Sequence, residues 1–290
     1  MDTASHSISP ELFTAAVGRP DAPLVLDVRR PARFQGSDWL LPGARYCAPE
    51  DVARFAAEHP PGDALVYCAY GHELCREASA TLREAGWNAR FLAGGIDGGE
   101  EGVDPPELVA AWRAQALPRL RKRPDLGVTG ERPSRWITRE RPKIDRIACP
   151  WLVRRFIDPQ AQFFYVPAPQ VQEEARRREA VAYDIPGAQI THEGELCSFD
   201  TLLRAFDLQL PALSTLARIV RGADTDRLDL ALQSAGLLAV SLGLSRLYSE
   251  DDHAMLEAAM PVYDALYAWC RSAQGEAHNW NPELMKGAAQ

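Results

Sequence analysis

The first half of the chain alternates short apolar runs with amphipathic segments. The runs at residues 22–29 ("APLVLDVR") and 63–68 ("DALVYC") each end at a turn or loop, as buried strands of a parallel sheet do. Residues 49–59 and 73–86 place apolar side chains at helical spacing, and residues 88–95 ("NARFLAGG") form another strand that ends in a Gly-Gly turn. This alternation predicts an α/β domain with a mostly parallel sheet flanked by helices.

The second half opens with a strand, a short helix and a second strand, and then becomes helical. Within residues 135–167 the helical stretch stops before Asp158 and Pro159, because a residue that precedes proline is pushed out of the helical region. Residues 225–248 and 251–273 carry broad apolar faces at helical spacing. This half is therefore predicted to be a mixed, mainly helical α+β domain.

Charge marks a boundary between the two halves. Residues 1–118 hold 10 Lys/Arg against 17 Asp/Glu, residues 119–146 hold 10 against 4, and residues 147–290 hold 12 against 19. The basic stretch also contains prolines and glycines, so we place a basic linker at 119–134, between a first domain at 1–118 and a second at 135–290. Its cations either belong to a solvated linker that pairs with the acidic domains, or attract an oxyanion or nucleic acid.

The chain carries no sign of export or of membrane insertion. It has no run of about 18 apolar residues, and its N-terminal stretch lacks the basic and apolar regions of a secretory signal, so we expect a cytoplasmic protein without membrane contact. The cysteines are too sparse for a disulfide framework and include no Cys-x-x-Cys pair, so we expect reduced and mostly buried thiols. They stand at positions 47, 68, 75, 149, 197 and 270.

One of these cysteines, Cys68, ends a predicted strand and is followed by a short loop that leads into a helix. The loop residues are Ala69, Tyr70, Gly71, His72 and Glu73. Backbone N–H groups of such a loop, together with the positive end of the following helix, stabilise a thiolate or a persulfide anion, which predicts that Cys68 is a nucleophile. The alternative is a small buried hydrophobic residue at the end of a strand.

A second cysteine, Cys75, lies seven residues after Cys68, in the first turns of the predicted helix. It either packs in the helix interface, which is the interpretation we favour, or resolves an oxidised Cys68 by forming a disulfide. A disulfide requires that the two Cα atoms lie within about 7 Å.

The first domain resembles a single-domain rhodanese over its whole length. The matching pieces are "LVLDVRRPARFQGSDWLLPGARY", the loop "VYCAYGHE" and the terminal "AGWNARFLAGGI". The resemblance implies that Cys68 is the sulfur-carrying nucleophile and that Ala69 to Glu73 form its cradle. It also implies structural roles near the loop for Asp27 and Arg29.

Three features of the loop region bear on the reaction. Rhodanese loops that take up thiosulfate usually offer cationic side chains, whereas this one offers Tyr70, a neutral His72 and Glu73, which favours a donor other than that dianion. An acidic insertion, "DGGEEGVDPPEL", displaces the usual closing helix. The related phosphatases carry an arginine six residues after the cysteine to bind phosphoryl oxygens, and this position is Leu74, so phosphate-ester hydrolysis is disfavoured.

The second domain holds histidines and carboxylates in three polar stretches. His192 lies in "DIPGAQITHEGELCSFD", Asp224 lies in "RGADTDR", and His253 follows "SEDD". Two imidazoles with one or two carboxylates suit a divalent metal such as iron, manganese or zinc. We therefore take His192, Asp224 and His253 as a candidate metal site.

The same stretches also have a purely structural explanation. Asp224 or Thr225 could cap a helix that begins near Asp226, and Ser249 with Asp252 forms a pair like a capping box. Acidic side chains in a first helical turn also interact favourably with the helix dipole. These residues would then serve helix ends rather than a metal.

The second domain is similar to the C-terminal domain of ChrB-type chromate-resistance proteins. The similarity runs from "RWITRERPKIDRIACPWLVRRFIDP" through "DIPGAQITHEGELCSFD" and "IVRGADTDRLDL" to "GLLAVSLGLSRL" and "DALYAWCR". It implies a role in chromate resistance or in chromate sensing. Family members that regulate transcription carry a different N-terminal region, and the net charge here is −8, so we expect no nucleic-acid partner.

The sequence supports two functional hypotheses. In the first, the protein is a rhodanese-like sulfurtransferase, in which Cys68 accepts sulfane sulfur as a persulfide and passes it to a thiol acceptor, and the second domain acts in chromate detoxification. In the second, it is a sensor or regulatory interaction protein that binds chromate or another oxyanion, with the rhodanese lobe as a docking module. Cys68 in its loop favours the enzyme, because a scaffold has no need of a reactive thiol.

Overall fold

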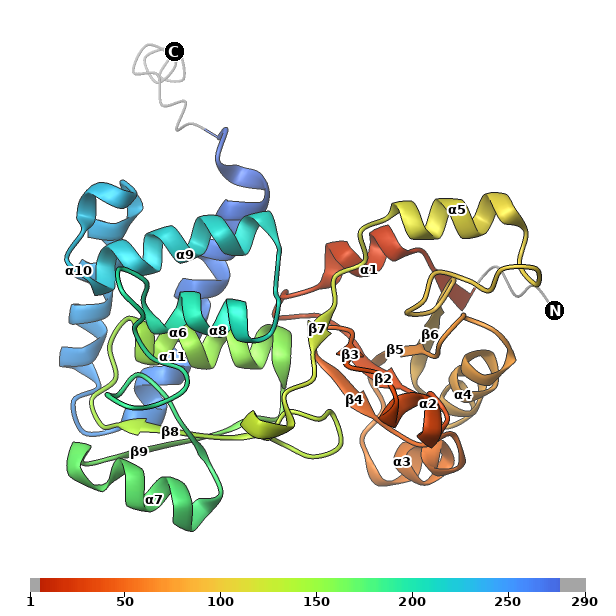
Figure 1. The fold of residues 1–290 in the computed structure, drawn as a ribbon, viewed down its shortest axis with the longest axis horizontal. Coiled ribbons are helices and arrows are strands. Elements are labelled where there is room, and N and C mark those ends of the chain that lie inside the picture. The colour runs from red at the N-terminus through yellow and green to blue at the C-terminus, as the bar shows by residue number, and fades with distance from the viewer. Residues whose placement is uncertain (1–5, 277–290) are drawn as a thin grey trace, which may run out of the picture.

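The computed structural model describes residues 6–276, which form two lobes (Figure 1). The elements between residues 7 and 114 lie in the first lobe and those between residues 135 and 273 lie in the second, and residues 119–134, here called the connector, run between them. Within the described range, no helix combines the length and the apolar character that crossing a bilayer requires.

A five-stranded sheet forms the centre of the first lobe. Its strands are β1 (Ser7–Ile8), β2 (Leu24–Asp27), β4 (Ala44–Tyr46), β5 (Asp63–Tyr67) and β6 (Asn88–Leu92). They lie in the order β1–β6–β5–β2–β4, and every pairing is parallel; Val66, for example, pairs with Leu26 on one side and with Phe91 on the other. The predicted α/β fold with a parallel sheet is confirmed.

Helices cover both faces of this sheet, because its central strands are apolar on both sides. They are α1 (Pro10–Ala16), α2 (Pro31–Gln35), α3 (Val52–Glu58) after the 3-10 turn η2 (Pro49–Asp51) and α4 (Glu73–Glu84). Helix α5 (Pro106–Ala114) instead packs against the segment at residues 94–99. Along β5, Val66 belongs to the core beneath α3 and α4, whereas Leu65 and Tyr67 belong to the core that includes α1 and α2. Alternate side chains of one strand therefore hold two layers of helices.

The second lobe is built on a smaller parallel sheet. Its strands are β8 (Arg135–Arg139), β9 (Gln162–Val166) and β10 (Val181–Ala182), in the order β10–β8–β9. Its helices are α6 (Asp145–Leu152), α7 (Val171–Arg178) after the 3-10 turn η5 (Ala168–Gln170), α8 (Ser198–Ala205), α9 (Pro211–Asp224), α10 (Gln233–Leu247) and α11 (Asp252–Ala268). π-Helical turns, η4 (Val153–Ile157) and η7 (Trp269–Ala273), extend α6 and α11. The predicted mixed, mainly helical domain is confirmed.

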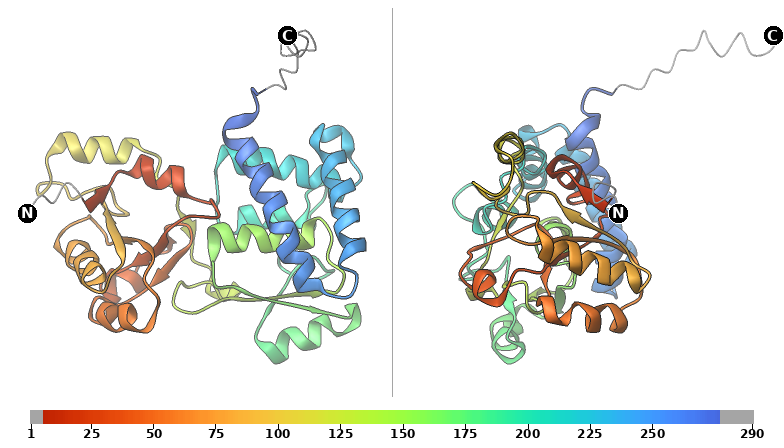
Figure 2. Two further views of the ribbon diagram at one scale, coloured as in Figure 1. Left: turned by 180° about the vertical axis from the view of Figure 1, so that it is seen from behind. Right: turned by 90° about the vertical axis from the view of Figure 1, so that its right-hand side faces the viewer.

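The sheet of the second lobe lies between unequal layers of helices. Helix α7 lies on one side, whereas α6, α8 and α9 lie on the other (Figures 1 and 2). Helix α11 packs against α6, and α10 packs against α9 (Figure 2). The thicker layer therefore contains most of the helical residues of this lobe.

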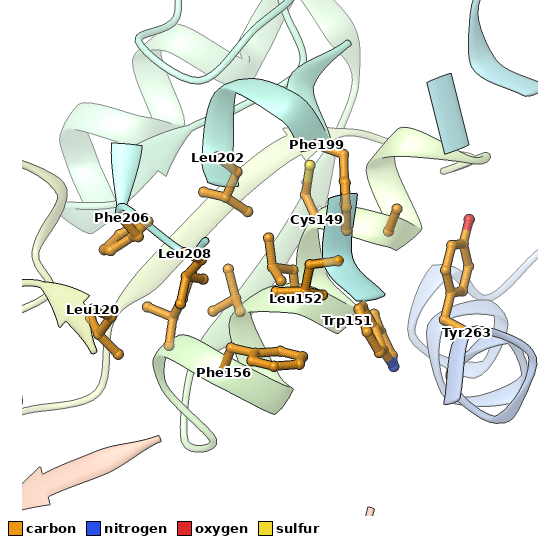
Figure 3. Packing of buried hydrophobic residues seen from close by; sticks show 14 of the residues in the cluster. Leu120, Cys149, Trp151, Leu152, Phe156, Phe199, Leu202, Phe206, Leu208 and Tyr263 are labelled. Carbon is orange, nitrogen blue, oxygen red and sulfur yellow. The ribbon is translucent and has the colours of Figure 1, made fainter. Parts of the chain in front are cut away.

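Aromatic side chains fill the core of this thicker layer (Figure 3). The ring of Trp151 lies 5.7 Å from that of Phe156 and 6.2 Å from that of Tyr263. Its indole N–H donates a hydrogen bond of 2.8 Å to Asp264, which satisfies the polar edge of a buried ring. This packing fixes α6, which carries Asp145 at its first position.

The helix predicted at 225–248 is shorter in the structure. Helix α9 ends at Asp224, and α10 begins only at Gln233, after the 3-10 turn η6 (Leu228–Leu230). Asp226 has a φ of 57°, a left-handed conformation that interrupts a right-handed helix. The interpretation of Asp224 as the cap of a following helix is therefore wrong, because this residue closes the preceding one.

The connector packs against both lobes. Its strand β7 (Leu120–Arg121) pairs antiparallel with β3 (Trp39–Leu40) of the first lobe. The Arg121 N–H donates to the Phe206 carbonyl of the second lobe at 2.9 Å, and Leu126 in the 3-10 turn η3 (Pro124–Leu126) is buried. The interpretation of the connector as a solvated linker is therefore wrong, since its apolar side chains are part of the core.

The two lobes also share one apolar core. Phe13 and Val17 of the first lobe belong to the same buried cluster as Phe156 and Ile157 of the second. In addition, the Gly43 N–H donates to the Phe156 carbonyl at 2.8 Å. The lobes therefore meet over a packed apolar interface, and the bounds proposed for the two domains stay a prediction.

Candidate functional site

Cys68 directly follows β5, and α4 begins at Glu73, so the loop between them is short. Strand β5 lies in the middle of the sheet, between β6 and β2. The loop is therefore at the carboxyl edge of a parallel sheet and at the N-terminus of a helix, which is the usual place for a ligand site in an α/β fold. Backbone N–H groups of Tyr70, Gly71 and His72 lie within hydrogen-bond reach of Cys68, and Glu73 is the first residue of α4.

The Gly94–Gly95 turn fixes the backbone of the loop. The Ile96 N–H donates to the Cys68 carbonyl at 3.0 Å, and the Asp97 N–H donates to the Ala69 carbonyl at 2.8 Å. Gly71 has a φ of 80°, and a Cβ atom at this position would lie 2.7 Å from the Gly94 nitrogen. Only glycine fits there without displacing backbone, so loop and turn hold each other in one conformation.

The sulfur of Cys68 lies against that of Cys75. The two Sγ atoms are 3.2 Å apart, and Cys75 Sγ is also 3.2 Å from the His72 carbonyl oxygen. Cys75 is 0% exposed, because α4 buries it, whereas Cys68 is 5% exposed. The second cysteine is therefore a direct partner of the first, in addition to its packing in the helix interface.

This contact makes Cys68 acidic. Donation from the Cys75 thiol lowers the pKa of Cys68 to about 6; burial opposes this effect, and the N–H groups of Gly71, Tyr70 and His72 add to it. The same hydrogen bond raises the pKa of Cys75 far above its ordinary value, and burial raises it further. Near neutral pH, Cys68 is thus mainly a thiolate and Cys75 a thiol that donates to it.

The acidic insertion folds over the mouth of the loop. Asp104 lies 2.8 Å from Nε2 of His72, and Glu100 lies 3.6 Å from its Nδ1. Asp97 forms an ion pair of 2.8 Å with Arg33, whose guanidinium lies 3.5 Å from the Tyr70 hydroxyl. Carboxylates of the insertion therefore contact His72, a residue of the Cys68 loop, which disfavours a dianionic donor beyond what the loop residues alone imply.

Asp27 and Arg29 form a buried network beside the base of the loop. Arg29 Nε donates to Asp27 Oδ1 at 2.9 Å, and the Tyr67 hydroxyl donates to Asp27 Oδ2 at 2.7 Å. Arg29 also donates to the Trp39 carbonyl at 2.9 Å. Because Tyr67 immediately precedes Cys68, this network fixes the strand end that presents the sulfur.

In the second lobe, His192 faces three carboxylates. Its Nε2 lies 3.1 Å from Asp224 Oδ2, 3.4 Å from Asp184 Oδ1 and 3.7 Å from Asp145 Oδ2. The ligand atoms of Asp145, Asp184 and His192 all lie within 4.8 Å of one another, a spacing that suits one metal ion. We call Asp145, Asp184, His192 and Asp224 the His192 cluster.

The carboxylates of the His192 cluster repel one another. Burial raises the pKa of Asp145, and the charges of Asp224 and Asp184 raise it further. Burial and the charge of Asp184 likewise raise the pKa of Asp224. The N–H groups of Ser198 and Phe199, at the start of α8, donate to Asp145 and orient it.

His253 is not part of this cluster. It lies on the exposed side of α11, where its ring packs edge-on against Tyr165 with the centroids 5.4 Å apart. Asp251 caps this helix by accepting a hydrogen bond from the Ala254 N–H at 2.9 Å, so His253 belongs to an ordinary first helical turn. The assignment of His253 to a metal site together with His192 is wrong, because α11 places His253 against Tyr165 and not beside His192. The spacing of the two histidines along the chain could not show this.

The sequence interpretation missed Asp145 and Asp184. Asp184 lies eight residues before His192 in the same polar stretch, which is a signal that could have pointed to it. Asp145 gave a weaker signal, a carboxylate that opens an otherwise apolar helix. Two cysteines near the His192 cluster, Cys149 and Cys197, are buried.

Both halves of the chain match known families. Residues 9–101 match the rhodanese-like domain, and residues 136–270 match the ChrB C-terminal domain. Protein ChrB from Cupriavidus metallidurans is 35% identical over 153 residues, which cover 49% of this chain and 45% of that protein. The match therefore spans less than half the length of this relative.

Solved structures match the first lobe. A rhodanese homolog from Thermus thermophilus is 28% identical, with 31% of this chain and 96% of that chain covered and a TM-score of 0.25. The thiosulfate sulfurtransferase from Pseudomonas aeruginosa is 22% identical, with 39% and 19% covered and a TM-score of 0.29. The chain thus matches a layout in which a rhodanese-like domain is followed by a ChrB C-terminal domain.

Proposed function

We propose that the protein is a sulfurtransferase in which Cys68 carries sulfur as a persulfide. The Cys68 thiolate attacks the outer sulfur of a donor persulfide and releases the donor thiolate, and an acceptor thiolate then takes this sulfur from Cys68. The observation that carries the proposal is the position of Cys68, which follows β5 in the loop before α4 and lies 3.2 Å from Cys75 Sγ. This hydrogen bond and N–H groups of the loop lower the pKa of Cys68 to about 6, which supports the proposal. A thiolate held in this way is ready to attack near neutral pH.

The donor in this proposal is the persulfide of a small thiol or of a protein. Asp97, Glu100 and Asp104 lie around the loop, so a dianion such as thiosulfate meets repulsion as it approaches Cys68.

A cytoplasmic location accompanies the proposal, because all six cysteines are free and a reducing compartment keeps them so.

A steady-state assay tests the transfer reaction. Glutathione persulfide and thiosulfate are offered as donors, and the sulfur that reaches a thiol acceptor is measured. We expect transfer from glutathione persulfide by the wild-type protein and by Cys47→Ser, a control at a buried cysteine outside the loop, and none by Cys68→Ser. Equal transfer by Cys68→Ser would contradict the proposal.

We further propose that the second lobe binds a divalent cation at the His192 cluster. Three carboxylates lie within 3.7 Å of one imidazole nitrogen, and Asp145 is fully buried. Asp224 stands at the C-terminal end of α9, where the helix dipole disfavours negative charge. A cation would offset this repulsion, and a ligand set of one imidazole with carboxylates suits manganese, iron or zinc.

Titration calorimetry on the metal-free protein with Mn²⁺, Zn²⁺ and anaerobic Fe²⁺ tests the cation site. We expect binding of at least one of these ions, and a loss of affinity of about tenfold or more in His192→Ala. The matched control is His253→Ala, which removes an imidazole outside the His192 cluster and should bind like the wild-type protein. No binding by the wild-type protein, or equal losses in both variants, would contradict the proposal.

We place both activities in chromate resistance. The support is the match of residues 136–270 to the ChrB C-terminal domain and the similarity to Protein ChrB. Chromate or another oxyanion is then a substrate or an effector, and the alternative role is that of an oxyanion sensor. Titration with chromate, and with sulfate as the control oxyanion, tests this part: binding of chromate alone supports it, and binding of neither ion would contradict it.

A further inference from the structure

Cys68 and Cys75 form a dithiol at the base of the loop. Their Sγ atoms are 3.2 Å apart, which is contact distance for two sulfurs. Cys75 therefore contacts the atom to which an external donor would deliver sulfur.

We infer that Cys75 is an internal acceptor that expels the sulfur carried by Cys68 as hydrosulfide and leaves a Cys68–Cys75 disulfide. The inference rests on the proposed persulfide on Cys68, and it deepens that proposal by naming an acceptor thiol and a product. The protein would then release hydrosulfide from persulfide donors, in addition to passing sulfur to other thiols.

The atoms and electrons of this step balance. Cys75 Sγ attacks Cys68 Sγ, and a bond forms between them. The bond from Cys68 Sγ to the carried sulfur breaks, and its electron pair leaves with that sulfur, which takes up the Cys75 proton and departs as hydrosulfide. The carried sulfur is reduced to hydrosulfide and Cys75 Sγ is oxidised, while Cys68 Sγ stays at the disulfide level that it already had in the persulfide. A dithiol reductant, such as a reduced disulfide oxidoreductase, reopens the disulfide for the next cycle.

The geometry suits this attack. A disulfide bond is about 2.05 Å long, so the two sulfurs have about 1 Å left to close. Cys75 lies on α4, and Cys68 directly follows β5, where the Ile96 N–H holds its carbonyl at 3.0 Å, so both thiols are held close to one another. Holding two reacting groups in contact replaces a bimolecular encounter with an internal step, which gives Cys75 an advantage over thiols in solution.

Persulfide formation also releases Cys75 from its role as a donor. In the resting protein, the hydrogen bond to the Cys68 thiolate is the largest cause that raises the pKa of Cys75. When Cys68 carries sulfur, the negative charge moves to the outer sulfur atom, and the inner sulfur no longer holds the Cys75 proton so strongly. Loading of Cys68 therefore removes the main obstacle to ionisation of Cys75.

A single-turnover experiment on the full chain tests the inference. Reduced protein is loaded with glutathione persulfide, desalted rapidly to remove small thiols, and followed over time by intact mass, by hydrosulfide release and by non-reducing peptide mapping. The variants are Cys75→Ser, which keeps a hydrogen-bond donor but cannot form a disulfide, and Cys47→Ser, which removes a buried thiol of the same lobe that lies outside the pair.

We expect the wild-type protein and Cys47→Ser to gain one sulfur atom and then lose it, with release of one hydrosulfide per chain and recovery of the Cys68–Cys75 peptide. Cys75→Ser should gain sulfur and keep it. If wild-type protein retains its sulfur as long as Cys75→Ser does, the inference is overturned and the persulfide carrier stands. If neither protein gains sulfur, the persulfide carrier fails, and the inference fails with it. The peptide map of the wild-type protein gives the same decision if Cys75→Ser does not fold.

Discussion

The Sγ atoms of Cys68 and Cys75 lie 3.2 Å apart, and the hydrogen bond between them lowers the pKa of Cys68. One contact therefore serves two purposes in this account. In the resting protein it stabilises the nucleophile, and after sulfur has been loaded it supplies an acceptor.

The first prediction concerns the pH dependence of Cys68. Its alkylation by iodoacetamide should be slow below its pKa of about 6, where the thiol predominates, and should reach a plateau above it, where the thiolate predominates. Cys75→Ala removes the donor, so the pKa of Cys68 should rise toward the ordinary value of about 8.5 and move the profile to higher pH. Cys75→Ser keeps a hydroxyl donor and should shift the profile less. Identical profiles for the three proteins would show that the contact does not set the acidity of Cys68.

The second prediction concerns donor choice. Neutralising the acids at the loop mouth with Asp97→Asn, Glu100→Gln and Asp104→Asn should raise the rate of sulfur transfer from thiosulfate by about 3- to 10-fold, because repulsion of the dianion falls. Transfer from glutathione persulfide should change less. Glu58→Gln serves as the control. Glu58 ends α3 and lies shortly before the start of β5, whereas Cys68 follows the other end of that strand. An unchanged thiosulfate rate in the triple variant would remove the electrostatic argument for donor choice.

The third prediction concerns the glycine that lets the loop lie against its neighbouring turn. Gly71→Ala should abolish sulfur uptake, since its Cβ would lie 2.7 Å from the Gly94 nitrogen and its φ is 80°. The strain should cost about 1–3 kcal/mol in the free energy of unfolding, measured by urea denaturation. Gly62→Ala is the control, because a Cβ there has nothing within 4 Å. Wild-type uptake by Gly71→Ala would mean that the loop geometry is not needed for loading.

The fourth prediction concerns the buried ion pair beneath the loop. Asp27→Asn should lower the free energy of unfolding by about 3–5 kcal/mol, because it leaves the Arg29 guanidinium buried without its counter-charge. Asp21→Asn breaks the exposed pair with Arg19 and should leave stability unchanged. Urea denaturation followed by circular dichroism compares the two variants. Similar stability of Asp27→Asn and the wild-type protein would argue against a structural role for Asp27.

The sequence was sufficient to predict those parts of the molecule whose residues are contiguous along the chain. Cys68, its loop and the start of α4 are contiguous, so strand, turn and helix patterns placed them together. The contact with Cys75 could be proposed but not chosen over simple packing, because only the turn geometry brings the two sulfurs to 3.2 Å. The sequence showed that the insertion is acidic, but it could not show that Glu100 and Asp104 lie beside His72. The insertion has no periodic pattern of apolar residues from which its conformation could be predicted.

The His192 cluster could be predicted only in part, because its residues are distant from one another along the chain. His192 and Asp224 were identified correctly as neighbours, because each lies in a polar stretch of an otherwise apolar region. Asp145 and Asp184 join them from α6 and from the segment after β10, and residues 145 and 224 are brought together only by the packing of α6 against α9. His253 was assigned wrongly because its residue type suited a ligand while its helix directs it elsewhere.

The assignment of Cys68 as the sulfur carrier is tested by the intact mass of the full chain immediately after exposure to glutathione persulfide. We expect the wild-type protein to gain one sulfur atom that a thiol reductant removes, and Cys68→Ser to gain none under the same conditions. A wild-type protein that neither gains sulfur nor releases hydrosulfide, or a Cys68→Ser variant that gains as much sulfur as the wild-type protein, would contradict the assignment of Cys68 as the sulfur carrier.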